Sequence, residues 1–104
     1  MININGEGWE IRLVSPSDPN LLRSDGSRTI GMCDDTKKHI YINEELESKL
    51  MKKVICHELT HAAMFSYDVD LTYEQEELVA NIISTYGQEI VHMTNLVFNR
   101  LKKK

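Results

Sequence analysis

Covalent cross-links and chain-stiffening residues are scarce in this sequence. Its 104 residues include two prolines, one tryptophan and two cysteines, Cys33 and Cys56. Two cysteines do not make a disulfide framework. We expect both to be free buried thiols, Cys56 in an apolar helix and Cys33 in a strand, which fits a reducing cytosol. In a chain this short, a bound metal would matter to stability as well as to chemistry.

Long apolar runs and a strong excess of one charge are also missing. No stretch approaches the roughly 20 apolar residues of a membrane-spanning helix, and no basic-then-apolar leader opens the chain. We therefore expect a cytoplasmic protein without membrane contacts. The net charge is -4, and the one basic cluster, "RLKKK", suits a solvated helix end. Direct nucleic-acid binding is not expected.

What is present is the composition of an ordinary globular domain. Hydrophobic residues make up 41% of the chain and charged residues 27%, which is unlike a disordered segment. The length predicts a single domain over residues 1–104, and no internal repeat or linker interrupts it.

Three segments have the patterns of β-strands. "WEIRLV" alternates, so that Trp9, Ile11 and Leu13 share one face of a half-buried strand. "RTIGMCDDTKKHIYIN" predicts two strands around the polar turn "DDTKK". Between these regions, "SPSDPNLLRSDGS" is typical of a loop with one short helical turn.

Two helices are predicted in the second half of the chain. Asn43 is a suitable N-cap for the first, which should end near Tyr67. The second begins at Thr72, where Thr72 and Gln75 match a capping box, and Gly87 weakens the expectation that it is unbroken. The apolar positions of this second helix recur at helical spacing: Val79, Ile82, Ile83, Tyr86, Ile90, Met93 and Val97.

The first helix contains "HELTH", and its ionisable residues share the face that is predicted to point inward. His57 and His61 are four residues apart, so both imidazoles lie on one side and can bind one Zn²⁺. Glu58 is turned about 100° from His57. It is therefore free to act as general base toward a water that the metal activates. The competing interpretation, two satisfied core histidines and an ion-paired glutamate, requires compensation for three buried ionisable groups.

A catalytic zinc site needs a third protein ligand, and the helix after it has three candidates, Glu74, Glu76 and Glu77. Hydrophobic phase alone does not separate them. Glu77 lies above the small residues Ala80, Asn81 and Ser84, which would let the two helices approach closely. We therefore favour Glu77, with Glu76 as the alternative, and expect Asn81 to hydrogen-bond a ligand histidine.

The remaining histidines and Cys56 are interpreted as structural. His92 is about 22 Å beyond Glu77 along a continuous helix, so it cannot share the metal unless the helix breaks near Gly87. His39 is expected to be an ordinary cross-strand residue.

"HELTH" followed by "EELVAN" resembles the gluzincin pattern, in which a downstream helix supplies a glutamate ligand. In thermolysin-like enzymes and the ImmA/IrrE peptidases, Asp or Asn follows that glutamate by four positions, which Glu77 and Asn81 match. "GMCDDTKKHIYIN" is similar to the strand-turn-strand of small zincin-like proteins of phages and mobile elements. The resemblance covers about residues 29–95.

The resemblance implies a minimal α+β zincin fold, in which a small three-stranded sheet packs on the "HELTH" helix and a long C-terminal helix. It also implies a zinc-dependent endopeptidase acting on a protein or peptide. The metal ligands would be His57, His61 and Glu77, and Glu58 would be the catalytic base. Larger relatives stabilise the oxyanion with an extra Tyr or His, for which Tyr67 and Tyr73 are the candidates here.

We expect the substrate to bind along the edge of the strand that contains His39 and Tyr41. One alternative is a non-catalytic zinc-binding protein that holds a partner on a zincin scaffold, although a purely structural site has no need of Glu58. Another alternative is a protein that binds no metal.

Overall fold

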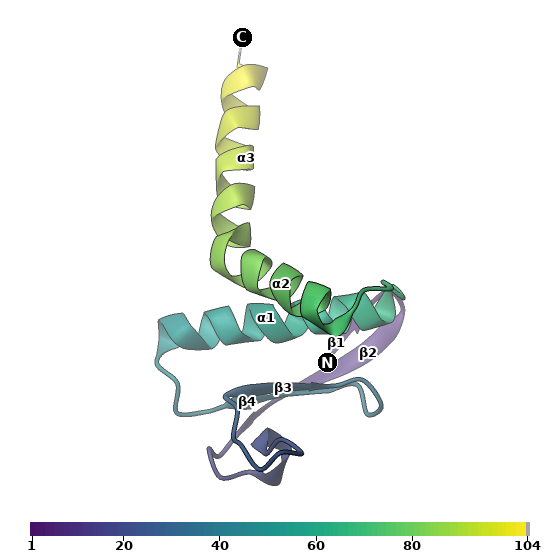
Figure 1. Cartoon of the computed structure of the whole chain (residues 1–104). Coiled ribbons are helices and arrows are strands. Elements are labelled where there is room, and N and C mark those ends of the chain that lie inside the picture. The colour runs from purple at the N-terminus through teal and green to yellow at the C-terminus, as the bar shows by residue number, and fades with distance from the viewer. Residues whose placement is uncertain (104) are drawn as a thin grey trace.

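A computed structural model describes residues 1–103, in which one long helix lies along a small sheet and a second helical segment crosses it (Figure 1). This arrangement confirms the predicted α+β architecture. The elements, in chain order, are β1 (Ile2–Ile4), β2 (Glu7–Val14), a 3-10 turn η1 (Pro19–Leu21), β3 (Gly31–Asp34), β4 (His39–Asn43), α1 (Ser48–Ser66), α2 (Tyr73–Ile82), a π turn η2 (Ile83–Gly87) and α3 (Gln88–Lys102). No helix in residues 1–103 is long and apolar enough to cross a lipid bilayer.

The sheet has four strands in the order β1-β2-β4-β3, one more than the three predicted. β2 and β4 are parallel, whereas the two outer pairs are antiparallel. The additional strand is β1, which pairs with β2 through a tight turn at Asn5 and Gly6, both with positive φ (49° and 81°). Asn-Gly is the preferred dipeptide for such a hairpin turn, so the sequence contained this signal.

β4, one of the two strands predicted in "RTIGMCDDTKKHIYIN", is buried on both faces. Ile40 and Ile42 join Trp9 and Val54 in the core beneath α1. Tyr41, between them, is only 4% exposed, and β4 also contacts η1. Leu13 is more exposed than predicted. It was expected to share the inward face with Trp9, but it is 57% exposed.

α1 begins at Ser48, so the predicted N-cap at Asn43 is wrong. Asn43 ends β4, and its Oδ1 accepts a hydrogen bond from the Glu45 backbone N–H, which closes a turn before the helix. The N-cap is Glu47, whose carboxylate accepts from the N–H groups of Lys49 and Leu50. The predicted end near Tyr67 is confirmed, since Tyr67 is the C-cap.

The C-terminal end of α1 is tied to the first hairpin. Trp9 Nε1 donates to Ser66 Oγ over 2.8 Å in the core, and Asn5 Nδ2 donates to the Ser66 carbonyl over 2.8 Å. These bonds satisfy buried polar groups of both elements, so they fix the helix along the sheet.

The second helical segment begins as predicted, because both hydrogen bonds of the Thr72–Gln75 capping box are present. Gly87 does not break the helix but ends the π turn η2, after which α3 projects away from the sheet and α1 (Figure 1). A Cβ at Gly87 would lie 3.3 Å from Ile83 Cγ2, so a side chain there would crowd this turn. The long C-terminal helix is thus present as three consecutive segments, α2, η2 and α3.

β3 approaches α1 closely at Gly31. A Cβ at this position would lie 2.6 Å from Val54 Cγ1 and 3.1 Å from Glu58 Oε2. Because the side chain of valine is stiff, the sheet could not keep this distance from α1 with a larger residue. Gly31 therefore sets the separation between the edge strand and "HELTH".

We expect Gly31→Ala to lower the free energy of unfolding by about 1–3 kcal/mol, since the added methyl overpacks the contact with Val54. Urea denaturation of Gly31→Ala, Val54→Ala and the double variant tests the cause. The double variant should lose less stability than the two single changes together, because the shortened side chain makes room for the methyl. Strict additivity would contradict this role for Gly31.

Candidate metal centre

His57 and His61 project from successive turns of α1 toward α2. Their Nε2 atoms are 3.2 Å apart, and the ring centroids are 4.9 Å apart. The i, i+4 spacing places the rings on one face. The His61 residue is only 8% exposed, so this pair forms the floor of a partly enclosed site.

Glu77 on α2 completes a three-residue group. Its Oε1 lies 2.7 Å from His61 Nε2, and its Oε2 lies 3.6 Å from His57 Nε2. Ala80, one turn further along α2, is fully buried, which lets α2 pack tightly on α1. Within residues 1–103, these three side chains are the one group of His, Cys, Asp or Glu whose ligand atoms are close enough to share a metal ion.

The donor set fits zinc. Ligand atoms about 2.0–2.2 Å from a tetrahedral zinc lie roughly 3.3 Å from each other, close to the 3.2 Å between the two Nε2 atoms. Two imidazoles and one carboxylate leave a fourth position, as in catalytic rather than structural zinc sites. The shorter contact between Glu77 and His61 is a hydrogen-bond distance that a metal would widen.

Glu76 contacts the other nitrogen of the same ring. Its Oε1 lies 2.6 Å from His61 Nδ1, on the side of the imidazole away from Glu77. A neutral imidazole has a single N–H and can donate to only one of two carboxylates. A cation at Nε2 removes this conflict, because Nδ1–H then donates to Glu76. The geometry thus gives Glu76 the task of orienting His61, and makes it a poor third ligand.

Asn81, four residues after Glu77, lines a hollow together with His57 and Glu77, and its hydrogen bond to a ligand histidine stays a prediction. Burial is the main cause that holds the pKa of His57 below its ordinary value, against the opposing effect of the Glu77 charge. His61 has a polar partner from α2 besides Glu77, namely Glu76. Such partners fix the ring orientation that a metal requires.

Glu58 lies outside the three-residue group but beside it. It is 8% exposed, and its pKa is raised to about 7, mainly by burial; the charge of Glu77 adds to this rise, whereas His61 and Arg23 oppose it. A carboxyl group that changes protonation near neutral pH is suited to proton transfer. Gly31 leaves the space that this side chain occupies.

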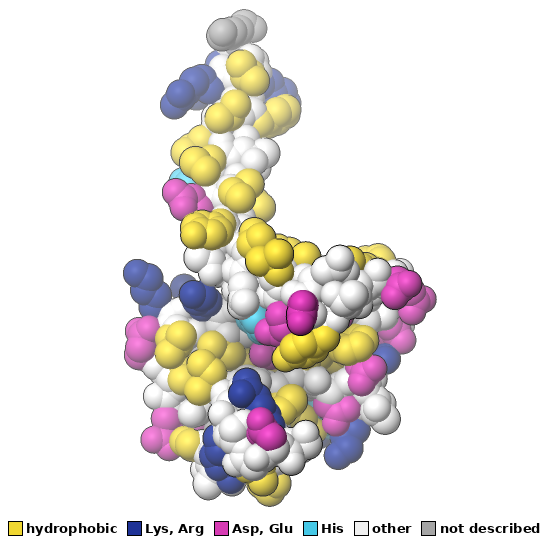
Figure 2. Space-filling model, in the orientation of Figure 1, with side chains coloured by type: hydrophobic (Ala, Val, Ile, Leu, Met, Phe, Trp, Pro, Cys, Tyr) yellow, Lys and Arg dark blue, Asp and Glu magenta, His cyan; other side chains and the backbone are white. Residues whose placement is uncertain are grey.

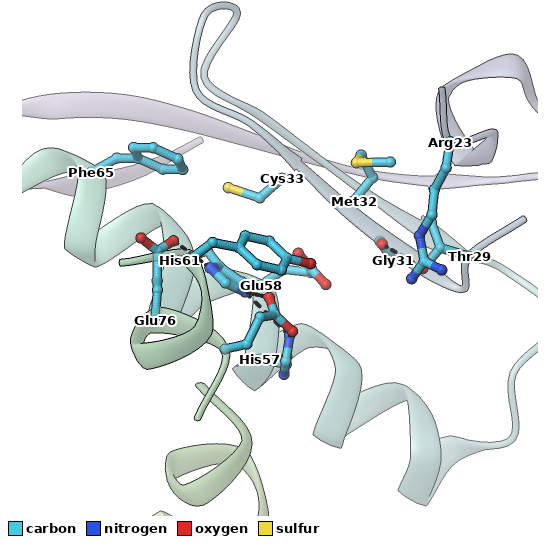
Figure 3. A pocket seen from close by; sticks show the side chains of 12 residues that line it. Arg23, Thr29, Gly31, Met32, Cys33, His57, Glu58, His61, Phe65 and Glu76 are labelled. Carbon is cyan, nitrogen blue, oxygen red and sulfur yellow. Dashed lines mark hydrogen bonds and ion pairs between the residues drawn. The ribbon is translucent and has the colours of Figure 1, made fainter. Parts of the chain in front are cut away.

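One cleft of about 440 Å³ between β3, α1 and α2 is lined by His57, Glu58, His61, Glu76 and Glu77 (Figure 3). Arg23, Thr29 and Tyr73 also border it with hydrogen-bond donors, but the Thr29 hydroxyl already donates to the Gly31 carbonyl. Arg23 was not predicted, because it comes from the loop "SPSDPNLLRSDGS", which carries no motif. Of the candidate tyrosines, Tyr67 is absent from the lining. Cys33 also lines the cleft, where burial raises its pKa to about 12, so it stays a neutral thiol.

The side chains interpreted as structural lie outside the three-residue group. His39 is hydrogen-bonded to Tyr41 (Nδ1 to Oη, 3.0 Å) and paired with Glu10. His92 is exposed on α3. Both cysteines are free, and each is partly rather than fully buried.

The predicted substrate edge at His39 and Tyr41 is wrong. Their strand, β4, is paired on both sides by β2 and β3 and therefore has no free edge. The edge next to the cleft belongs to β3, whose residues Gly31, Met32 and Cys33 line it.

A mixed sheet under a helix with two facing histidines, a buried glutamate between them in sequence and a third glutamate from the next helix defines a minimal zincin-like protein. A family of peptidases described as the IrrE N-terminal-like domain matches residues 15–95. The chain belongs to this family, which supports a metallopeptidase-type function in general. No curated protein and no solved structure matched the chain.

Zinc affinity distinguishes the roles of Glu76 and Glu77. We expect Glu77→Gln to weaken zinc binding more than Glu76→Gln, because the first change removes a ligand and the second only the partner of His61, which costs about 10–100-fold. Glu74→Gln, an exposed glutamate on the same helix, is the matched control and should bind zinc like the original chain. Competition with a chromophoric chelator measures the zinc affinity of all three variants. An unchanged zinc affinity of Glu77→Gln would exclude Glu77 as a ligand.

Proposed function

We propose that this chain is a zinc-dependent endopeptidase that hydrolyses peptide bonds of a protein substrate in the cytoplasm. The observation that carries the proposal is the position of Glu58. It is buried at the cleft beside His61, yet its carboxylate is not part of the metal-binding group. A non-catalytic zinc site would be closed by a fourth ligand, whereas three groups converge here among the described residues.

In this mechanism His57, His61 and Glu77 hold the zinc. When bound, zinc supplies Lewis acidity that polarises the scissile carbonyl and makes a water more acidic. Glu58 accepts a proton from the attacking water and later gives it to the leaving amine nitrogen. Glu76 and Asn81 keep the two imidazoles in place while the charge changes.

The substrate would bind as an additional strand beside β3. β3 pairs only with β4. The Gly31 carbonyl accepts a hydrogen bond from Thr29 Oγ1, and the other backbone groups of the outer edge are available to an extended peptide. Gly31, Met32 and Cys33 of this strand face the same cleft as Glu58. A peptide paired there would cross the site with its carbonyl groups near the histidines.

Two donors at the cleft can stabilise the negative oxygen that develops on the scissile carbonyl. Tyr73 offers a phenol from the start of α2, and Arg23 offers a guanidinium from the loop before β3. Arg23 is the only lysine or arginine among the described residues that line the cleft with Glu58, Glu76 and Glu77. We assign the main role to Tyr73, because it stands on a helix anchored by the Thr72 cap.

Glu58→Gln tests the base. The change keeps the shape of the side chain, so the variant should retain zinc and fold normally while cleavage falls by about 10²–10⁴-fold. New N-termini in cell lysates incubated with the original chain and with Glu58→Gln identify substrates. Any purified substrate then gives the rate ratio. Equal cleavage by both proteins would refute the assignment of Glu58.

Tyr73→Phe tests the oxyanion donor. Loss of one donor typically costs about 10²–10³-fold in kcat, with zinc affinity unchanged. Tyr67→Phe removes the same hydroxyl from an exposed tyrosine outside the cleft and is the matched control. If both variants cleave alike, Tyr73 has no part in the reaction.

A further inference from the structure

α3 carries an apolar face that the rest of the described chain leaves uncovered. We call it the α3 face; its residues line one shallow groove and are Ile90, Met93, Thr94, Val97, Phe98 and Leu101. The five large apolar side chains among them are each 47–59% exposed. Figure 2 shows hydrophobic side chains gathered along this projecting helix. No residue of α3 is buried.

This exposure is unusual for a helix of fifteen residues. α3 continues from α2 through the π turn, but a helix in a protein normally gains most of its stability from packing of its apolar side. Within residues 1–103, α3 packs substantially only against the adjoining π turn η2. Five half-exposed large side chains present about 500 Å² of apolar surface, near the upper end of what monomers expose. An uncovered apolar surface of this size is typical of an interaction site.

The order of residues in the face is self-complementary. Ile90, Thr94, Val97 and Leu101 follow at spacings of four, three and four, which is the heptad pattern of a helix-helix seam. This spacing reads the same from either end. In an antiparallel pair, Ile90 therefore lies opposite Leu101 of the second copy, and Thr94 opposite Val97 of the second copy.

The charges of α3 favour the same antiparallel arrangement. Glu89 lies in its first turn and Arg100 in its last. They are eleven residues apart, about three turns, so they share one flank of the face. In an antiparallel pair, symmetry brings Glu89 of each copy near Arg100 of the other. In a parallel pair, the flank with Glu89 and Arg100 would instead face the opposite flank of the second copy, which carries Val91, and both charges would lack a partner.

We infer that α3 joins two copies of this chain as an antiparallel helix pair. The α3 face supplies about 500 Å² per copy. Symmetry doubles this area, and with the polar flanks the interface totals about 1,200 Å², the lower limit for a specific interface. α3 projects from the body of the protein (Figure 1), so the two bodies lie at opposite ends of the pair and leave both clefts open.

Sedimentation velocity on the full chain tests the pairing. At about 100 µM we expect a species of twice the 12.0 kDa chain mass, dissociating in the micromolar range. Val97→Glu, which places a charge in the centre of the α3 face, should sediment as a monomer. Asn99→Glu adds the same charge to the opposite, polar side of α3 and should remain a dimer.

Charge reversals test the orientation. Glu89→Lys and Arg100→Glu should each weaken the dimer several-fold, because each change sets like charges together at both ends of the pair. The variant with both changes restores opposite charges and should recover the original dissociation constant. Failure of this recovery would refute the antiparallel arrangement.

A chain that stays monomeric at about 100 µM would overturn the proposal and leave the α3 face to a different partner. So would a dimer that Val97→Glu leaves intact. The result of the dimer test is independent of the peptidase proposal, because Val97 is not among the residues that line the cleft. Val97→Glu should therefore bind zinc as the original chain does.

Discussion

The tight packing of α2 on α1 is the contact on which the candidate metal centre depends. Two carboxylates of α2 approach one imidazole of α1, Glu76 at 2.6 Å from Nδ1 and Glu77 at 2.7 Å from Nε2 of His61. Partly buried negative groups so close together are costly without a cation between them. The close approach is possible because Ala80 presents only a methyl group at the helix contact.

The sheet restricts the same site from the other side. Gly31 allows β3 to approach α1 until Glu58 lies against the strand backbone. The buried carboxyl group is thus held between an edge strand and a ligand helix, where burial raises its pKa to about 7. The Glu58 carboxyl group is positioned by two separate elements, β3 and α1, and the contact of Gly31 with Val54 sets the distance between them.

Local signals predicted the features that depend on few neighbouring residues. The Thr72 capping box, the end of α1 near Tyr67 and the spacing of His57 and His61 are all set within one or two turns of chain. The N-cap at Asn43 was mistaken because a turn and a helix start favour the same residue type. The Asn5–Gly6 hairpin was missed although its signal was local.

Features that depend on the order of strands could not be predicted in the same way. Whether β4 lies inside the sheet or at its edge depends on the parallel pairing with β2 across about 25 residues, which no local pattern reveals. The place of Arg23 at the cleft depends on the path of an irregular loop. The sequence favoured Glu77 over Glu76 but did not indicate that Glu76 would contact the other ring nitrogen of His61, because that contact depends on the rotation of α2 about its axis.

The π turn at Ile83–Gly87 makes the chain sensitive to length at one point. A π turn holds one residue more than a regular helical turn, and each residue rotates a helix by about 100°. One residue thus decides in which direction α3 faces, while α2 keeps its phase against His57 and His61. Loss or gain of a single residue between positions 83 and 87 would redirect the outer helix, while His57, His61 and Glu77 all precede this turn in the chain. Related chains could in this way differ in what they bind while keeping the same chemistry.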